Sequence, residues 1–307
     1  MMRCYVAFGA VTLALLAVHV RAADAVGRIV YPRKEGGGYR LHVMDADGKN
    51  DRELPGQTAA LNVFPAWSPD GKRVAFMSAA MPQPNQHQIT IIQADGTGLT
   101  TLNVGSERAG LASWSRDGKQ MAFSAGNQMP SVFVADGDGN NPRRINPEGS
   151  GGFGAFWLPD GKKLGYTRFA QGEMKAEIYL ANADGSDEEK LVPGEEMKFA
   201  VAGPGGVSLD GKRLAYLSIS PQTRKGSVHL WDFANRGDSR LDLEISVEGE
   251  LEGMPLPAWS PDGRYLLMPL QTDRGMGLFR VSENGKTRTR LTPEGVDCLA
   301  GAWIAAP

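Results

Sequence analysis

One pattern recurs along this chain: a short apolar stretch, a turn containing Asp-Gly, and a second apolar stretch. It reads "PAWSPDGKRVAFMS" at 65–78, "ASWSRDGKQMAFSA" at 112–125 and "PAWSPDGRYLLMPL" at 257–270. An internal repeat constrains the fold more than any other feature, because every unit has to adopt the same local structure and pack against its neighbours. The pattern itself is typical of two strands joined by a tight hairpin turn.

Five of the six units carry a tryptophan, five carry an Asp-Gly turn after this position, and the units recur every 43–52 residues. The tryptophan anchors are Trp67, Trp114, Trp157, Trp259 and Trp303, with Val207 in the remaining unit, and the residues before the turn glycine are Asp70, Asp117, Asp160, Asp210 and Asp262. Aspartate hydrogen-bonds turn amides and glycine adopts a positive φ. We therefore expect both sets to be structural.

A second pair of strands completes each unit. "ITIIQADG" at 89–96 and "IYLANADG" at 178–185 are strands that run into another tight turn. The second strands of the units include "VAFM" at 74–77 and "LAYL" at 214–217. Both stretches are continuously apolar, which favours strands buried on both faces. A four-stranded antiparallel sheet covered on both faces and repeated at this spacing predicts the blade of a β-propeller.

The two ends of the repeat region complement each other. The segment 27–33 begins as a second strand, and 300–307 ends as a first strand. Five whole units and one composite unit predict an all-β, six-bladed propeller over 26–307, with the C-terminal strand completing the N-terminal blade and closing the ring. Trp303 would then be structural.

The first residues differ from the rest of the chain. Arg3 precedes an apolar run at 5–20, which leads into "RAADA". This order is typical of a secretory signal peptide, here 1–25, with cleavage after Ala22 or Ala25. The alternative is a retained membrane anchor, for which the run is short. We expect an exported protein, periplasmic or secreted, with no stable membrane span after cleavage.

The stretch at 65–76 followed by 89–102 resembles the propeller repeat of the TolB type, a relative of WD repeats. The resemblance covers 27–307 and is most specific in Trp-Ser-Pro-Asp-Gly at 67–71 and 259–263. It implies a propeller fold and a cell-envelope location. TolB itself has an α/β domain ahead of its propeller, and the sequence is expected to lack that domain, so the resemblance says less about a role in the Tol system.

The sequence contains few candidate catalytic or metal-binding residues. His42 and His229 fall at a repeat position that is aromatic in three other units, which favours packing, and His87 lacks a spaced partner for a metal site. "DADG" at 45–48 and "DGDG" at 136–139 lack the final glutamate of an EF-hand and match the other turns. No cofactor is therefore predicted, although the sequence leaves open an ion such as calcium in a central channel.

Methionines and cations gather in the loops that a propeller places opposite its Asp-Gly turns. They are Met81, Met129, Met174, Met197, Met254 and Met276, with Arg168, Arg224, Lys225 and Arg274. Methionine is flexible and polarizable, which suits a surface that adapts to a partner. We call this set the loop face and predict that it binds a protein or peptide segment; the alternative is that these methionines only fill gaps beneath the loops.

Two functions remain open. The favoured one is a monomeric binding or scaffolding module of the cell envelope without catalysis, because no G-x-S-x-G motif is present and a net charge of −2 does not suggest nucleic acid. The alternative is a propeller enzyme of lyase, lactonase or cyclase type that acts on a carbohydrate or small molecule in the central funnel. Asp297, Glu252 and Arg108 lie close enough to the expected funnel to keep that alternative.

Overall fold

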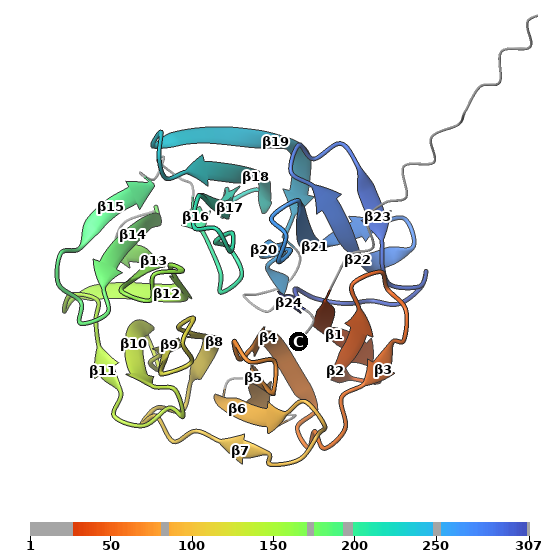
Figure 1. Cartoon of the computed structure of the whole chain (residues 1–307), viewed down its shortest axis with the longest axis horizontal. Helices are drawn as coiled ribbons and strands as arrows, with labels where there is room; N and C mark the ends of the chain where they lie inside the picture. Colours follow the sequence, from red (N-terminus) through yellow and green to blue (C-terminus); the bar gives the residue numbers. More distant parts are fainter. Residues whose placement is uncertain (1–26, 81–85, 171–174, 193–198, 248–252, 306–307) are drawn as a thin grey trace, which may run out of the picture.

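The strands are arranged as sheets around a common centre. A computed structural model describes residues 27–80, 86–170, 175–192, 199–247 and 253–305, which form 24 strands. The sheets radiate outward from the centre like blades (Figure 1). The predicted signal peptide, 1–25, lies outside the described residues.

Four of the sheets are separate four-stranded antiparallel blades. We name them B to E in chain order. Blade B comprises β8 (Ala109–Trp114), β9 (Gln120–Ala125), β10 (Ser131–Asp136) and β11 (Arg143–Arg144); blade C comprises β12 (Ser150–Trp157), β13 (Lys163–Ala170), β14 (Glu177–Asn182) and β15 (Glu189–Val192). Blade D comprises β16 (Phe199–Val201), β17 (Arg213–Ile219), β18 (Lys225–Asp232) and β19 (Gly237–Ser246); blade E comprises β20 (Ala258–Trp259), β21 (Tyr265–Thr272), β22 (Gly275–Ser282) and β23 (Arg288–Arg290).

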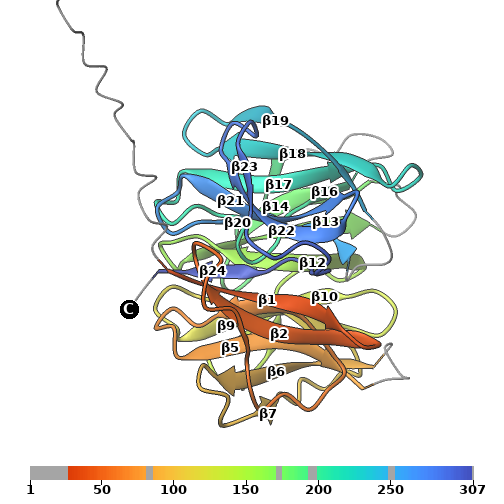
Figure 2. The ribbon, with the colours of Figure 1, turned by 90° about the vertical axis from the view of Figure 1, so that its right-hand side faces the viewer.

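The remaining strands form one eight-stranded sheet, sheet A, in the order β24-β1-β2-β4-β5-β6-β7, with β3 paired to β2. Its strands are β1 (Arg28–Glu35), β2 (Gly38–Asp45), β3 (Arg52–Glu53), β4 (Leu61–Trp67), β5 (Arg73–Ala79), β6 (His87–Gln93), β7 (Thr100–Thr101) and β24 (Ala302–Ile304). The C-terminal strand β24 lies antiparallel to β1, with Trp303 opposite Ile29, and the side view shows the two strands next to each other (Figure 2).

The predicted six-bladed, closed ring is therefore wrong. The structure has four separate blades and one eight-stranded sheet, and none of these sheets closes on itself through hydrogen bonds. The reason is a lateral contact: Tyr39 of β2 pairs in parallel with Leu61 of β4, and the Tyr39 amide donates to the Ala60 carbonyl at 2.9 Å. Gly38 permits this approach, because a Cβ there would lie 2.0 Å from the Ala60 oxygen.

The inner strands end where the sequence placed its anchors. β4, β8, β12 and β20 end at Trp67, Trp114, Trp157 and Trp259, and β24 contains Trp303. Val207, which replaces tryptophan in its unit, makes only an isolated bridge to Leu214. Bulges shift the register within β4, β8 and β12 shortly before their tryptophans, and Phe64 and Leu111 there have positive φ angles of 51° and 54°.

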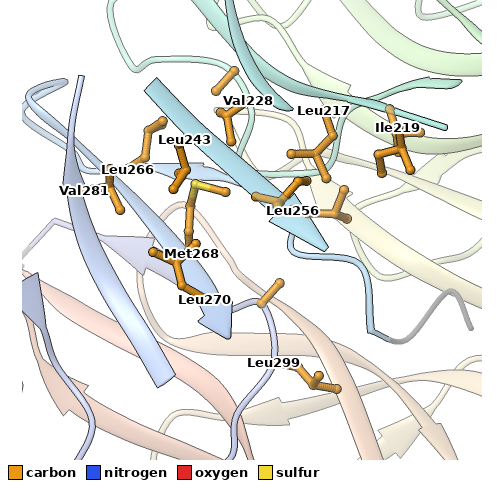
Figure 3. Packing of buried hydrophobic residues seen from close by; sticks show 14 of the residues in the cluster. Leu217, Ile219, Val228, Leu243, Leu256, Leu266, Met268, Leu270, Val281 and Leu299 are labelled. Atoms are coloured by element: carbon orange, nitrogen blue, oxygen red, sulfur yellow. The ribbon is translucent and has the colours of Figure 1, made fainter. Parts of the chain in front are cut away.

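The largest apolar cluster lies between blades D and E and extends to the centre. Leu217 and Val228 of blade D face Leu266 and Met268 of blade E (Figure 3). Phe64, Leu111, Leu256, Leu299 and Ala300, from inner strands and the connections to them, belong to the same cluster. Burial of these side chains holds neighbouring sheets together, in addition to the isolated hydrogen bonds between them.

The repeated Ser-x-Asp-Gly sequence forms one hydrogen-bonded turn. The Ser68 hydroxyl donates to Asp70 at 2.6 Å and accepts from the Arg73 amide at 2.9 Å, and Asp70 also accepts from the Lys72 amide at 3.1 Å. The same bonds recur around Ser208 and Asp210. The serine hydrogen bond, followed by the backbone one, holds the pKa of Asp70 and of Asp210 below the ordinary value.

We predict that part of the stability of the fold depends on the ionised form of these turn aspartates. Because the folded pKa is lowered, the carboxylates stabilise the fold above about pH 4, the pKa of an unfolded aspartate, and this stabilisation is lost as the pH falls through the lowered folded pKa. The double variant Ser68→Ala, Ser208→Ala should melt below the parent at pH 6, and the gap should narrow at pH 3. Melting temperatures followed by circular dichroism across this range test it.

Ser282→Ala is the matched control. Ser282 makes the same contact with Asn284, which does not titrate, at 2.7 Å, and accepts from the Thr287 amide at 3.0 Å. Its effect on the melting temperature should not change with pH. An equal pH dependence in the control and in the double variant would contradict the assignment.

Candidate functional site

A cavity of about 430 Å³ lies at the centre, at the ends of the inner strands. We call the end of the sheets that bears the Asp-Gly turns the turn face. The cavity is lined by the five anchor tryptophans and by Val207, and by the turn residues Pro69, Pro159 and Pro261. Phe64, Leu256 and Ala300 line it too and belong to the central apolar cluster. The inner part of the cavity is therefore apolar.

Most polar side chains of the lining are already hydrogen-bonded inside the protein. Ser68, Ser208 and Ser260 donate to the aspartate of their own turns, and Ser113 donates to the Ala155 carbonyl at 3.0 Å. Arg116 differs: it is exposed, and its Nη1 donates to the carbonyl of Leu209, which belongs to a turn 93 residues away, at 3.2 Å.

Arginines also connect each of three units to the next tryptophan. The guanidinium groups of Arg28, Arg73 and Arg213 stack on Trp67, Trp114 and Trp259, with 4.9, 5.4 and 4.4 Å from the guanidinium carbon to the ring centre. Arg28 and Arg213 also donate to the turn carbonyls of Gly71 and Gly263, at 3.0 and 2.7 Å. Cation–π contacts and charge-assisted hydrogen bonds make these arginines clamps between neighbouring units.

A polar cluster occurs in sheet A and recurs in blade D. In sheet A the Tyr31 hydroxyl donates to Asp51 at 2.9 Å, and His42 lies between Asp51 and Glu35, at 3.3 and 2.9 Å. His42 is 5% exposed and its ring contacts Tyr31. The packing role predicted for this histidine position is confirmed here.

The equivalent cluster of blade D has the contacts of a Ser-His-Asp triad. His229 Nδ1 lies 2.7 Å from Asp238, and its Nε2 lies 2.9 Å from the Ser227 hydroxyl. Ser227 is only 8% exposed, and Glu35 takes the corresponding contact to His42 in sheet A. The recurrence of the network without a serine identifies it as part of the architecture of the sheets.

Burial also keeps other potential nucleophiles protonated. Desolvation and the nearby Asp51 raise the pKa of the Tyr31 hydroxyl, and desolvation and Glu188 raise that of Tyr166. Burial raises the pKa of the Cys298 thiol to about 12. Thiolate is the reactive form of cysteine, so Cys298 is unreactive at neutral pH.

The structure describes only part of the predicted loop face. Met81, Met174 and Met197 lie outside the described residues. Met129 and Met276 are half-buried at hairpins between second and third strands, and Met254 is half-buried in the connection that leads to β20. All three are therefore at the end of the sheets opposite the turn face.

The structure describes all four cations of the loop face. Arg168 pairs with Glu188 and stacks on Tyr179, and Arg274 pairs with Glu294. Arg224 and Lys225 are exposed at the hairpin between β17 and β18.

Within the described residues, no group of three His, Cys, Asp or Glu side chains is placed to hold a metal ion, and no helix is long and apolar enough to cross a membrane. Neither the cavity nor the arginine clamps were predicted from the sequence. One signal was available: Arg116 stands two residues after its tryptophan, where three other units have proline.

Comparisons with solved structures agree with the propeller fold. The chain is similar to TolB from Acinetobacter baumannii, with a TM-score of 0.71, 22% identity, and coverage of 91% of this chain and 67% of that one. It is also similar to a chain of a nidogen/laminin complex, with a TM-score of 0.64, 13% identity, and coverage of 90% and 98%. At these identities the likeness concerns the fold alone.

Sequence comparisons identify the family. The Tol-Pal system protein TolB of Bordetella parapertussis is 30% identical over 161 residues, 52% of this chain and 35% of that protein. Its counterpart in Bordetella pertussis is 27% identical over 161 residues, 52% and 36% of the two chains. The aligned part is thus about a third of the length of these relatives. The family model "TolB beta propeller domain" matches residues 25–305, and the chain belongs to this family.

Proposed function

We propose that this protein is a binding module of the cell envelope, periplasmic or secreted, which holds a protein or peptide segment on its loop face. The observation that carries the proposal is the family match over 25–305. Relatives in this family are named as Tol-Pal system proteins, and a binding role in an envelope assembly is the function that such a likeness favours.

The chemistry of the loop face supports this role. Met129, Met254 and Met276 are half-buried, so a partner can contact their side chains while the sheets hold their backbones in place. The exposed Lys225 adds positive charge, which would favour a partner segment with acidic residues beside apolar ones. Met254 also contacts the central apolar cluster, so the alternative of gap-filling methionines predicts a loss of stability instead.

The tagged protein is first used to capture a partner from an extract of the envelope. The affinity of the purified partner is then measured for the parent and for two triple variants. Replacing Met129, Met254 and Met276 with serine should reduce the affinity for a captured and then purified partner by about tenfold or more, since three buried apolar contacts are lost. Replacing the same residues with leucine should change it little. Retention of the partner by a folded serine variant would contradict the proposal.

A further inference from the structure

The turns around the cavity differ from one another at one position. The residues two places after each anchor are Pro69, Arg116, Pro159, Leu209, Pro261 and Ala305, and all six line the cavity. Five of them are apolar. Arg116 is therefore the one charged group that the described chain presents in the lining of the cavity.

The cavity has the size of a site for a small molecule. Its volume of about 430 Å³ falls within the range of about 300–1,000 Å³ that is usual for such sites. Its walls are indole edges, prolines and aliphatic side chains, so the body of a ligand would have to be apolar. The hydroxyls of Ser68, Ser208 and Ser260 are committed to the turn aspartates and offer a ligand no free donor.

Arg116 has donors left over. It forms no ion pair with a described residue, and its single hydrogen bond within the described chain goes from Nη1 to the Leu209 carbonyl. A guanidinium has five N–H donors in a planar fork. A carboxylate accepts two of them in parallel, and such a charge-assisted pair is stronger than a bond to a neutral carbonyl.

The other cations of the turn face are not placed to bind a carboxylate in the cavity. A lysine or arginine follows each Asp-Gly pair, at Lys72, Lys119, Lys162, Lys212 and Arg264. Each of these turns also contains an aspartate, and Arg264 and Lys212 lie 2.7 and 3.8 Å from theirs. None of the five lines the cavity. Selection between an anion and a neutral molecule would therefore depend on Arg116.

We propose that the turn-face cavity binds a small apolar carboxylate, such as an aromatic or branched aliphatic acid. The apolar body lies among the tryptophans and prolines, and the carboxylate is held by Arg116 in place of its contact with Leu209. This site is independent of the loop face, because it lies at the other end of the sheets and involves different residues.

The experiment measures calorimetric binding of 2-naphthoate and of its neutral counterpart 2-naphthamide to the full chain. The parent should bind the carboxylate about tenfold more tightly, in line with a hydrogen bond to a charged group. Arg116→Met should remove this preference and leave the amide affinity nearly unchanged, because the apolar walls remain. Lys119→Met, which removes an exposed cation of the same turn outside the cavity, should keep the preference.

Arg116→Lys keeps the charge but not the planar fork, and should retain a reduced preference. If Arg116→Met melts at a much lower temperature than the parent, the acid and amide affinities of Arg116→Lys are compared with those of the parent instead. Equal affinity for acid and amide in the parent, a preference that survives in Arg116→Met, or no binding of either probe would overturn the proposal. It would also be overturned if a peptide with a C-terminal Trp-Phe carboxylate bound over tenfold more tightly than naphthoate, which would assign the site to a chain end.

Discussion

Gly38→Ala is expected to separate β2 from β4 and to lower the melting temperature by several degrees. A Cβ at this position would lie 2.0 Å from the Ala60 carbonyl oxygen and 2.9 Å from its carbon. Both are backbone atoms, so the strands themselves would have to move apart. The movement would break the hydrogen bond from Tyr39 to Ala60. Overpacking and a lost hydrogen bond together amount to about 3 kcal/mol.

Gly37→Ala is the control for this prediction. Gly37 is the neighbouring residue of the same turn, and a Cβ there would meet nothing within 4 Å. Differential scanning calorimetry of the two variants should show a large decrease for Gly38→Ala and almost none for Gly37→Ala. Amide exchange at Tyr39 should become faster only in the first. Equal melting temperatures for the two variants would show that the lateral contact contributes little to sheet A.

Deletion of 302–307 is expected to be still more destabilising. It removes β24, whose Trp303 and Ile304 pack on clusters formed by β1, β4 and blade E. It also uncovers Ile29 and Val30 of β1, which are fully buried in the intact chain. Losing two large half-buried side chains and a three-residue ladder corresponds to about 4–6 kcal/mol.

A point variant separates the two parts of this effect. Trp303→Ala retains the backbone pairing of β24 with β1 and removes only the indole, so its loss of stability should be about half that of the deletion. Chemical denaturation measures both. A deletion that unfolds at the same denaturant concentration as the parent would show that the edge of β1 does not require β24.

The repeat made the strands predictable, because strand period and turn chemistry are local properties. Val74 to Met77 is continuously apolar and is buried in β5, and the Asp-Gly turns fall between inner and second strands as expected. The extent of each sheet was not predictable. It depends on whether one carbonyl approaches one amide between two units, and Gly38 looks like any other turn glycine in the sequence.

The cavity could not be predicted from the sequence, for a similar reason. The segments before the anchors indicated an apolar centre, but the space left between them depends on the bulges in β4, β8 and β12. Arg116 was visible as a departure from the repeat. Its contact with Leu209 depends on how the fold places two turns that are 93 residues apart in the sequence.

The arginine clamps have a consequence for how the molecule comes apart. Sheet A clamps itself through Arg28 and Trp67, Arg73 of sheet A clamps blade B, and Arg213 of blade D clamps blade E. Three boundaries lack such a clamp, because the corresponding pairs are Gln120 and Trp157 between blades B and C, Lys163 and Val207 between blades C and D, and Tyr265 and Trp303 between blade E and sheet A. Of these three, only the boundary of blades C and D lacks the tryptophan as well, so we expect local opening at the turn face to start there.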